Sequence, residues 1–230
     1  MEPTTQTENH DSPRVEGSGA LNAIFDAIVA LLIAVPGLGA ASAGVAVYRS
    51  ADAATAEEIV AELEVTATTM TDAELVDAIH SLMVWGGLGL AVTGAVLVVA
   101  GIAFAAYSRR VRRRLEGTGL VIDDRIVLAV VGAVVSAVTS FVPFSPLVGG
   151  GVAGYVRRGS SGDALRIGAL AGIALAAPYA LLLVFLAGGA FAANAVTLGL
   201  LIVAMLAISS AITVVLSAIG GYAGSAIADR

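Results

Sequence analysis

Long uncharged stretches, separated by short charged segments, dominate the hydropathy pattern of the chain. Between flanking charged or histidine residues they hold 22 residues (27–48), 28 residues (81–108), 31 residues (126–156) and 62 residues (167–228). A transmembrane helix needs about 20 apolar residues, so the first two stretches each predict one span. The last would be about 93 Å long as one helix and must fold back. Its large aliphatic side chains disappear at 188–194, which predicts a break there and spans at about 167–186 and 196–218.

The stretch 126–156 predicts a different structure. As a helix it would be about 47 Å long, which is too long for one upright span and too short for two. Pro143 and Pro146 interrupt its middle, and three glycines follow at 149–151. We expect two short helices that form a hairpin and return to the side they left; the alternative is one tilted span. Because non-helical backbone at membrane depth needs cover, we expect the turn to be buried in protein or to line a cavity.

The segment 50–80 is polar and carries helix-start signals. Thr55-x-x-Glu58 and Thr71-x-x-Glu74 match the capping-box pattern, and the second continues into the 81–108 stretch. The predicted fold class is therefore all-α: a polytopic membrane helix bundle with four full spans, a Pro-broken short helical hairpin and a small acidic extracytoplasmic helical loop. We divide the chain into a disordered acidic tail (1–19), a two-span module with an acidic outer loop (20–108), an Arg-rich cytoplasmic linker (109–125) and a C-terminal membrane domain (126–230).

Arginines predict the orientation of the bundle. Cytoplasmic loops are rich in basic residues, and one Arg cluster precedes the hairpin while a second, at 157, 158 and 166, follows it. Only a hairpin puts both clusters on one side. We expect a cell-membrane protein with its N-terminus, Arg-rich loop and C-terminus in the cytoplasm. The topology and lipid-interface residues are Arg109, Arg110, Arg112, Arg113, Arg114, Tyr48, Trp85, Tyr107 and Tyr155.

The amino-acid composition excludes or disfavours several classes of function. Hydrophobic residues make up 58% of the chain and charged residues 13%, so a water-soluble surface is excluded. The net charge of −6 argues against nucleic-acid binding, and the absence of Cys excludes disulfides, thiolate metal sites and Cys nucleophiles. All basic residues are Arg, and this acidic, lysine-free composition resembles that of halophilic archaeal proteins; a GC-rich genome is the alternative. Four acids within residues 1–19 argue against a cleaved signal peptide.

Catalytic motifs are missing from the sequence. HExxH and G-x-S-x-G do not occur, and no pair of acids lies within the spans. We expect no enzymatic activity, no cofactor and no catalytic or metal-binding residue. Eight carboxylates between 50 and 80 have no metal-ligand spacing and are interpreted as a solvated face, with cation capture by an extracytoplasmic sensor as the alternative.

Glycine supplies the main positive signal. Small residues let membrane helices approach closely, so we expect a structural or interaction role through helix packing, within the bundle or in a homo-oligomer surrounded by lipid. The packing candidates are Gly87, Gly94, Gly101, Gly150, Gly154, Gly168, Gly172, Gly220 and Gly224. The alternative is a small channel or transporter with a path at the hairpin, lined by Asp26, Ser140, Pro143, Ser145 and Pro146.

Three segments of the C-terminal part carry a family resemblance. The runs FVPFSPLVGGGVAGY (141–155), LRIGALAG (165–172) and SAIGGYAG (217–224) resemble a domain-of-unknown-function family of small haloarchaeal integral-membrane proteins. The resemblance extends from about residue 123 onward and implies no activity, ligand or catalytic residue. We interpret the first half of the chain as a separate two-span module joined at the arginine linker.

Overall fold

The computed structural model describes residues 17–63, 71–115, 125–157 and 160–229, and every element within them is a helix. Most of the predicted acidic tail and the second half of the predicted linker lie outside the described residues. The helices are α1 (Gly17–Ser50), α2 (Ala53–Leu63), α3 (Asp72–Leu115), α4 (Arg125–Val138), α5 (Ser145–Arg157), α6 (Ser161–Ala192) and α7 (Val196–Ala228). The all-α prediction is confirmed.

Four of these helices are long and apolar enough to cross a membrane, as predicted. They contain the candidate spans Ala23–Ser50, Asp72–Val111, Ser161–Ala192 and Val196–Ala228. Large apolar side chains such as Leu31, Leu200 and Met205 stay exposed on the outside of the bundle. A helix that is apolar on all sides and exposes such residues is suited to lipid. The chain is a multi-pass membrane protein.

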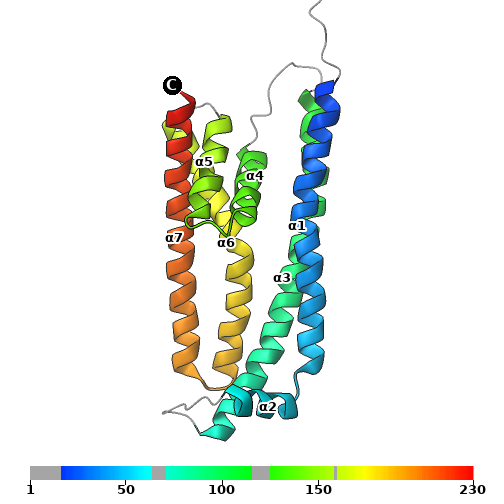
Figure 1. The fold of residues 1–230 in the computed structure, drawn as a ribbon, viewed down its shortest axis with the longest axis vertical. Coiled ribbons are helices and arrows are strands. Elements are labelled where there is room, and N and C mark those ends of the chain that lie inside the picture. The colour runs from blue at the N-terminus through cyan, green and yellow to red at the C-terminus, as the bar shows by residue number, and fades with distance from the viewer. Residues whose placement is uncertain (1–16, 64–70, 116–124, 158–159, 230) are drawn as a thin grey trace, which may run out of the picture.

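Two pairs of long helices build the bundle (Figure 1). α1 packs along α3 and α6 along α7, while α3 meets α6 at the end of the molecule that carries α2. We call this the acidic end. The opposite end, where α3 and α5 finish and α4 and α6 begin, is called the arginine end. The two predicted Arg clusters therefore flank the same end of the bundle.

The hairpin prediction is confirmed, and the single tilted span is wrong. α4 and α5 are 14 and 13 residues long, pack against each other and leave and return at the arginine end. The residues 139–144 between them form a series of turns. Pro146 is the second residue of α5, where a missing N–H breaks no helical hydrogen bond.

The predicted break at 188–194 is confirmed, and one capping prediction is wrong. α6 ends at Ala192, and the chain reverses at Asn194, whose φ is 56°. Asn is one of the residues that adopt this left-handed conformation. Thr55 does not cap α2. The helix begins at Ala53, and the Asp52 carboxylate accepts the Thr55 amide N–H at 2.7 Å.

The second capping box has the predicted geometry. The Thr71 amide donates to Glu74 Oε2 at 2.8 Å, and the Glu74 amide donates to Thr71 Oγ1 at 3.3 Å. α3 then runs without interruption into its membrane-spanning part. The acidic start of this helix is therefore continuous with a span, as the sequence pattern indicated.

Candidate functional site

The turn of the hairpin lies at membrane depth. α4 rises about 21 Å from Arg125 to Val138, whereas the hydrocarbon core of a bilayer is about 30 Å thick. The turn is held by backbone hydrogen bonds from Val142 N–H to Thr139 O at 2.8 Å and from Leu147 N–H to Phe144 O at 2.9 Å. Within the described chain, neither the N–H nor the C=O of Phe141 takes part in a backbone hydrogen bond.

This turn is open to the outside, which corrects the expectation that it is buried or lines a cavity. Phe141 is 83% exposed and Phe144 67% exposed. Ser140 and Pro143 are also exposed, and Ser145 is half-buried. The physical reason is that α4 and α5 pack on α6 and α7 only along their shafts, so no other part of the described chain reaches over their tip.

Phe144 has an unusual backbone conformation. Its φ is 67°, in the left-handed region that glycine tolerates and bulky residues avoid. A glycine would make the same turn with less strain. This strain was not predictable from the residue type, because a left-handed position is normally signalled by Gly or Asn.

Glycines bring the backbones of α5, α6 and α7 into direct contact. A Cβ added at Gly150 would lie 2.0 Å from the carbonyl oxygen of Ser217, and one at Gly168 would lie 2.3 Å from the same oxygen. α5 and α6 therefore both approach α7 at one residue. The other predicted packing glycines of this region, Gly154, Gly172, Gly220 and Gly224, each leave a Cβ within 3.0 Å of a neighbouring helix.

α1 and α3 form a second glycine interface. Gly87, Gly94 and Gly101 of α3 all face α1, and a Cβ on Gly94 would lie 2.3 Å from the Ala41 nitrogen. An opposing pair, Gly37 and Gly44, faces this row from α1, and sequence reasoning missed Gly44. The signal was present, since these two glycines share the seven-residue spacing of the α3 row.

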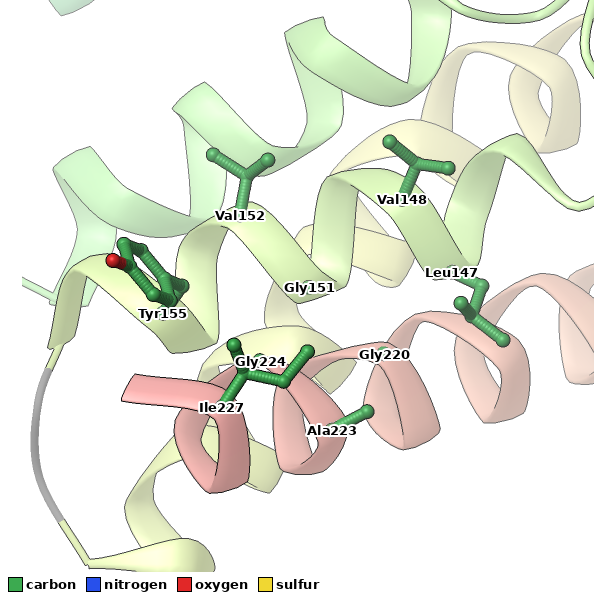
Figure 2. A pocket seen from close by; sticks show the side chains of 9 residues that line it. All are labelled: Leu147, Val148, Gly151, Val152, Tyr155, Gly220, Ala223, Gly224 and Ile227. Carbon is green, nitrogen blue, oxygen red and sulfur yellow. The ribbon is translucent and has the colours of Figure 1, made fainter. Parts of the chain in front are cut away.

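An apolar groove of about 300 Å³ runs along the contact between α5 and α7 on the outside of the bundle (Figure 2). It begins at Leu147, near the turn, and ends near Tyr155 and Ile227 at the arginine end. Gly151, Gly220 and Gly224 form its floor, and Gly220 and Gly224 are buried there against the backbone of α5. The full lining is Leu147, Val148, Gly151, Val152, Tyr155, Gly220, Ala223, Gly224 and Ile227.

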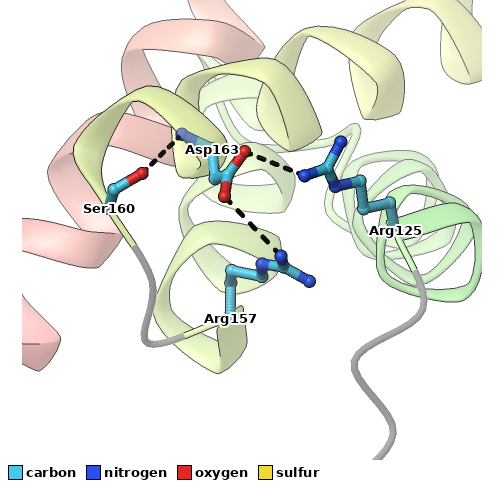
Figure 3. Close-up of polar contacts among 4 residues, drawn as sticks. All are labelled: Arg125, Arg157, Ser160 and Asp163. Carbon is cyan, nitrogen blue, oxygen red and sulfur yellow. Dashed lines mark hydrogen bonds and ion pairs between the residues drawn. The ribbon is translucent and has the colours of Figure 1, made fainter.

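A polar cluster fastens the open ends of the hairpin to α6 (Figure 3). The Asp163 carboxylate pairs with Arg125 of α4 at 3.1 Å and with Arg157 of α5 at 3.7 Å. The Ser160 hydroxyl caps α6 by accepting the Asp163 N–H at 3.4 Å. The sequence contained a signal for this cluster, since Asp163 is the only acid in the second Arg cluster, but the pairing with Arg125 depends on the hairpin.

Asp26 does not join the hairpin turn. It is 5% exposed and lies one helical turn from Val29, which packs with Phe104 and Val127 near the start of α4. The turn is at the other end of α4. The structure therefore places Asp26 about the length of α4 away from Pro143 and Pro146.

The interface candidates divide between the two ends. Tyr107 and Tyr155 lie toward the arginine end and are 37% and 46% exposed, whereas Tyr48 and Trp85 lie toward the acidic end. Trp85 also packs against Phe185 of α6, with ring centroids 6.3 Å apart. Arg109, Arg110 and Arg113 are exposed, while the side chains of Arg112 and Arg114 lie outside the described residues.

The acidic end contains no metal cluster in the part of the chain that the structure describes. A hollow of about 450 Å³ there is lined by Glu74, Asp77 and residues 193–198 at the α6–α7 turn. The Thr55 amide and hydroxyl hold the pKa of the Asp52 carboxyl below its ordinary value. These carboxylates are arranged as helix caps and solvated side chains.

Comparison with known families gives one match. Residues 126–227 match the model of a family of unknown function, DUF5518. The match begins within α4 and ends within α7, so it contains the hairpin, the groove and the glycine contacts of α5, α6 and α7. Residues 1–125 lie outside it. No curated protein and no solved structure matches the chain.

Proposed function

We propose that this chain is a non-enzymatic structural protein of the membrane that acts through helix contacts with protein inside the lipid. The observation that carries the proposal is the exposed turn at membrane depth. Lipid offers no hydrogen-bonding partner to irregular backbone, which is tolerated there only when protein or water covers it. With Phe141 83% exposed, the cover comes from outside the described chain.

The glycine contacts support this role. Without a hydrophobic drive between helices in lipid, close packing supplies the association energy. The α5, α6 and α7 glycines are already engaged within the molecule, and they hold the hairpin firmly enough to present its turn. The bundle therefore holds the hairpin turn in a fixed position, where it can bind another protein.

Photo-crosslinking in native membranes tests the proposal. A benzophenone amino acid at Phe141 is expected to give protein adducts. The matched control is the same group at Met205, which is 68% exposed on α7 and is expected to react with lipid. Lipid adducts alone at both positions would contradict a role in protein contacts.

A channel or transporter is the second candidate function. Its support is the start of α5 at membrane depth, since broken helices of this kind surround substrate paths in transporters. It differs from the first candidate in requiring water at the turn. Because the chain has no Cys, a Ser140→Cys variant isolates this point. Fast labelling by a hydrophilic maleimide supports a path, and protection contradicts one because it excludes water at the turn.

The orientation and the environment are part of the same proposal. The positive-inside rule supports a cytoplasmic arginine end and an extracytoplasmic acidic end. The net charge of −6 and the absence of lysine support a high-salt habitat. Cation capture by the acidic end lacks support from the arrangement of its described carboxylates.

A further inference from the structure

Helix α3 packs on α6 along one stripe of residues. The Ser81 hydroxyl donates to the Gly189 carbonyl oxygen at 2.8 Å, and the Trp85 ring lies against Phe185. One turn further along α3, a Cβ added at Gly89 would lie 2.6 Å from the Phe185 Cβ. The three α3 positions are four residues apart, which is the spacing of neighbours on one helix face. The stripe joins the two-span module to the part of the chain that matches DUF5518, because α3 precedes the match and α6 lies inside it.

The same stripe leads to Thr93 on α3 and to Pro178 on α6. Thr93 is one turn beyond Gly89, and Pro178 is one turn before Leu182, whose side chain also faces Gly89. α3 runs from the acidic end to the arginine end and α6 runs in the opposite direction, so the two steps reach the same level. Thr93 therefore lies opposite the turn of α6 that ends at Pro178.

The Thr93 hydroxyl is a buried donor that the described chain does not use. Thr93 is 5% exposed, and its Oγ1 has no hydrogen-bond partner among the described residues. Thr213 shows the usual arrangement in a membrane helix, since its hydroxyl donates to Ser209 O one turn earlier at 2.8 Å. Ser217 is the other described residue with a buried, unpartnered hydroxyl, and it lies among glycines rather than opposite a proline. Buried hydroxyls are normally hydrogen-bonded, so Thr93 requires a partner at this point.

Pro178 leaves an acceptor without its helical donor in the facing turn. Proline has no backbone N–H, so the Ala174 carbonyl, four residues earlier in α6, lacks the hydrogen bond that the helix would otherwise supply. The turn lies inside the candidate span Ser161–Ala192. Within a membrane, a carbonyl freed by proline is satisfied by a neighbouring helix, by a Ser or Thr side chain or by an ordered water molecule. An unused donor on α3 thus faces a freed acceptor on α6.

We propose that one buried water molecule joins these two groups, accepting a hydrogen bond from the Thr93 hydroxyl and donating one to the Ala174 carbonyl oxygen. Buried water typically connects polar groups that have no other partner. The α3 and α6 backbones are closest at Gly89, and Figure 1 shows α3 leaning away from α6 toward the arginine end, which leaves room between the helices at Thr93. Together with the Ser81 hydrogen bond, this water fixes the register of the two-span module on α6.

A double-mutant cycle on the full-length chain tests the site. Thr93→Val removes the hydroxyl, and Pro178→Ala gives the Ala174 carbonyl its helical donor. Alone, Thr93→Val is expected to raise the unfolding equilibrium constant about threefold, the effect typical of a hydrogen bond between membrane helices. In the Pro178→Ala background it is expected not to destabilise, because the carbonyl no longer needs the water. Unfolding by SDS in mixed micelles is followed by the emission of Trp85, which lies in the same interface.

Thr213→Val is the matched control for this cycle. Its hydroxyl already donates within α7, so its effect should be the same with and without Pro178. Additive effects of Thr93→Val and Pro178→Ala would overturn the water bridge, because they would mean that the Thr93 hydroxyl and the Ala174 carbonyl do not depend on each other.

Solid-state NMR in lipid bilayers detects the water itself and does not depend on how Pro178→Ala folds. Magnetisation from water protons is expected to reach the Ala174 signals in the wild type and in Thr93→Ser, which keeps the hydroxyl, and to be lost in Thr93→Val. Absence of this transfer in the wild type, or its persistence in Thr93→Val, overturns the proposal. Either result leaves the proposed role in protein contacts standing, because the exposed turn is not part of this site.

Discussion

Two neighbouring glycines of α5 give a sharp test of backbone packing. At Gly150 an added Cβ would lie 2.0 Å from Ser217 O, whereas at Gly151 the nearest atom would be Gly220 O at 3.6 Å, an ordinary contact. Gly150→Ala therefore forces α7 away by about 1.4 Å, the difference between 2.0 Å and the 3.4 Å at which ordinary contact begins. Overpacking of this kind costs about 1–3 kcal/mol.

The matched variant Gly151→Ala adds the same methyl group to α5 without the clash. Both substitutions gain the same helix propensity, about 1 kcal/mol, so their difference isolates the overpacking. We expect the free energy of unfolding of Gly150→Ala to be about 1–3 kcal/mol below that of Gly151→Ala. The assay is reversible unfolding by SDS in mixed micelles, followed by emission of the single Trp. Equal SDS midpoints for the two variants would refute the close approach of α5 and α7.

Four further predictions concern other parts of the molecule. Phe144→Gly should be more stable than Phe144→Ala by about 1 kcal/mol in the SDS assay, because only glycine relieves the φ of 67°; the reverse order would mean that the turn is not strained. Asp163→Asn should lower stability by about 0.2–1 kcal/mol, since the ion pairs are partly exposed, and Arg125→Gln in that background should add little; additive losses would show that the two residues are not paired. The folded state lowers the pKa of Asp52, so the charged carboxylate stabilises the start of α2 at pH values above the ordinary 3.8, and this stabilisation is lost as the pH falls through the lower folded pKa. The protection of the Thr55 amide from hydrogen exchange should therefore drop only below pH 3.8. The Asp52→Asn variant should show no such drop. Cysteines at Ser160 and Ala192 should label from opposite faces of intact cells, the first only after permeabilisation, and the opposite pattern would invert the orientation.

Span lengths and helix breaks were predictable because they depend on local sequence. Uncharged runs set the four long helices, and Pro143 with the glycines after Pro146 set the hairpin, since neither feature depends on distant residues. Thr71 and Glu74 likewise act on each other across a single turn.

The misplaced features depend on tertiary contacts. α6 continues through Gly188, where Trp85, about a hundred residues earlier, packs against it. Asp52 and Thr55 could each cap the start of α2. Asp52 caps it because its carboxylate is a stronger hydrogen-bond acceptor than a hydroxyl. The exposure of the turn could not be predicted from sequence, because it depends on how far α6 and α7 extend over the tip of the hairpin.

Because of the backbone contacts among α5, α6 and α7, the positions that tolerate mutation differ from those in a soluble domain. In a soluble domain the large buried side chains restrict evolution, whereas here bulky residues such as Leu200 and Met205 face the outside and are interchangeable with other apolar residues. The positions that resist change are those with no side chain at all, and a single-base change in a glycine codon is enough to disrupt them. We therefore expect substitutions to be tolerated least at the smallest residues of this protein.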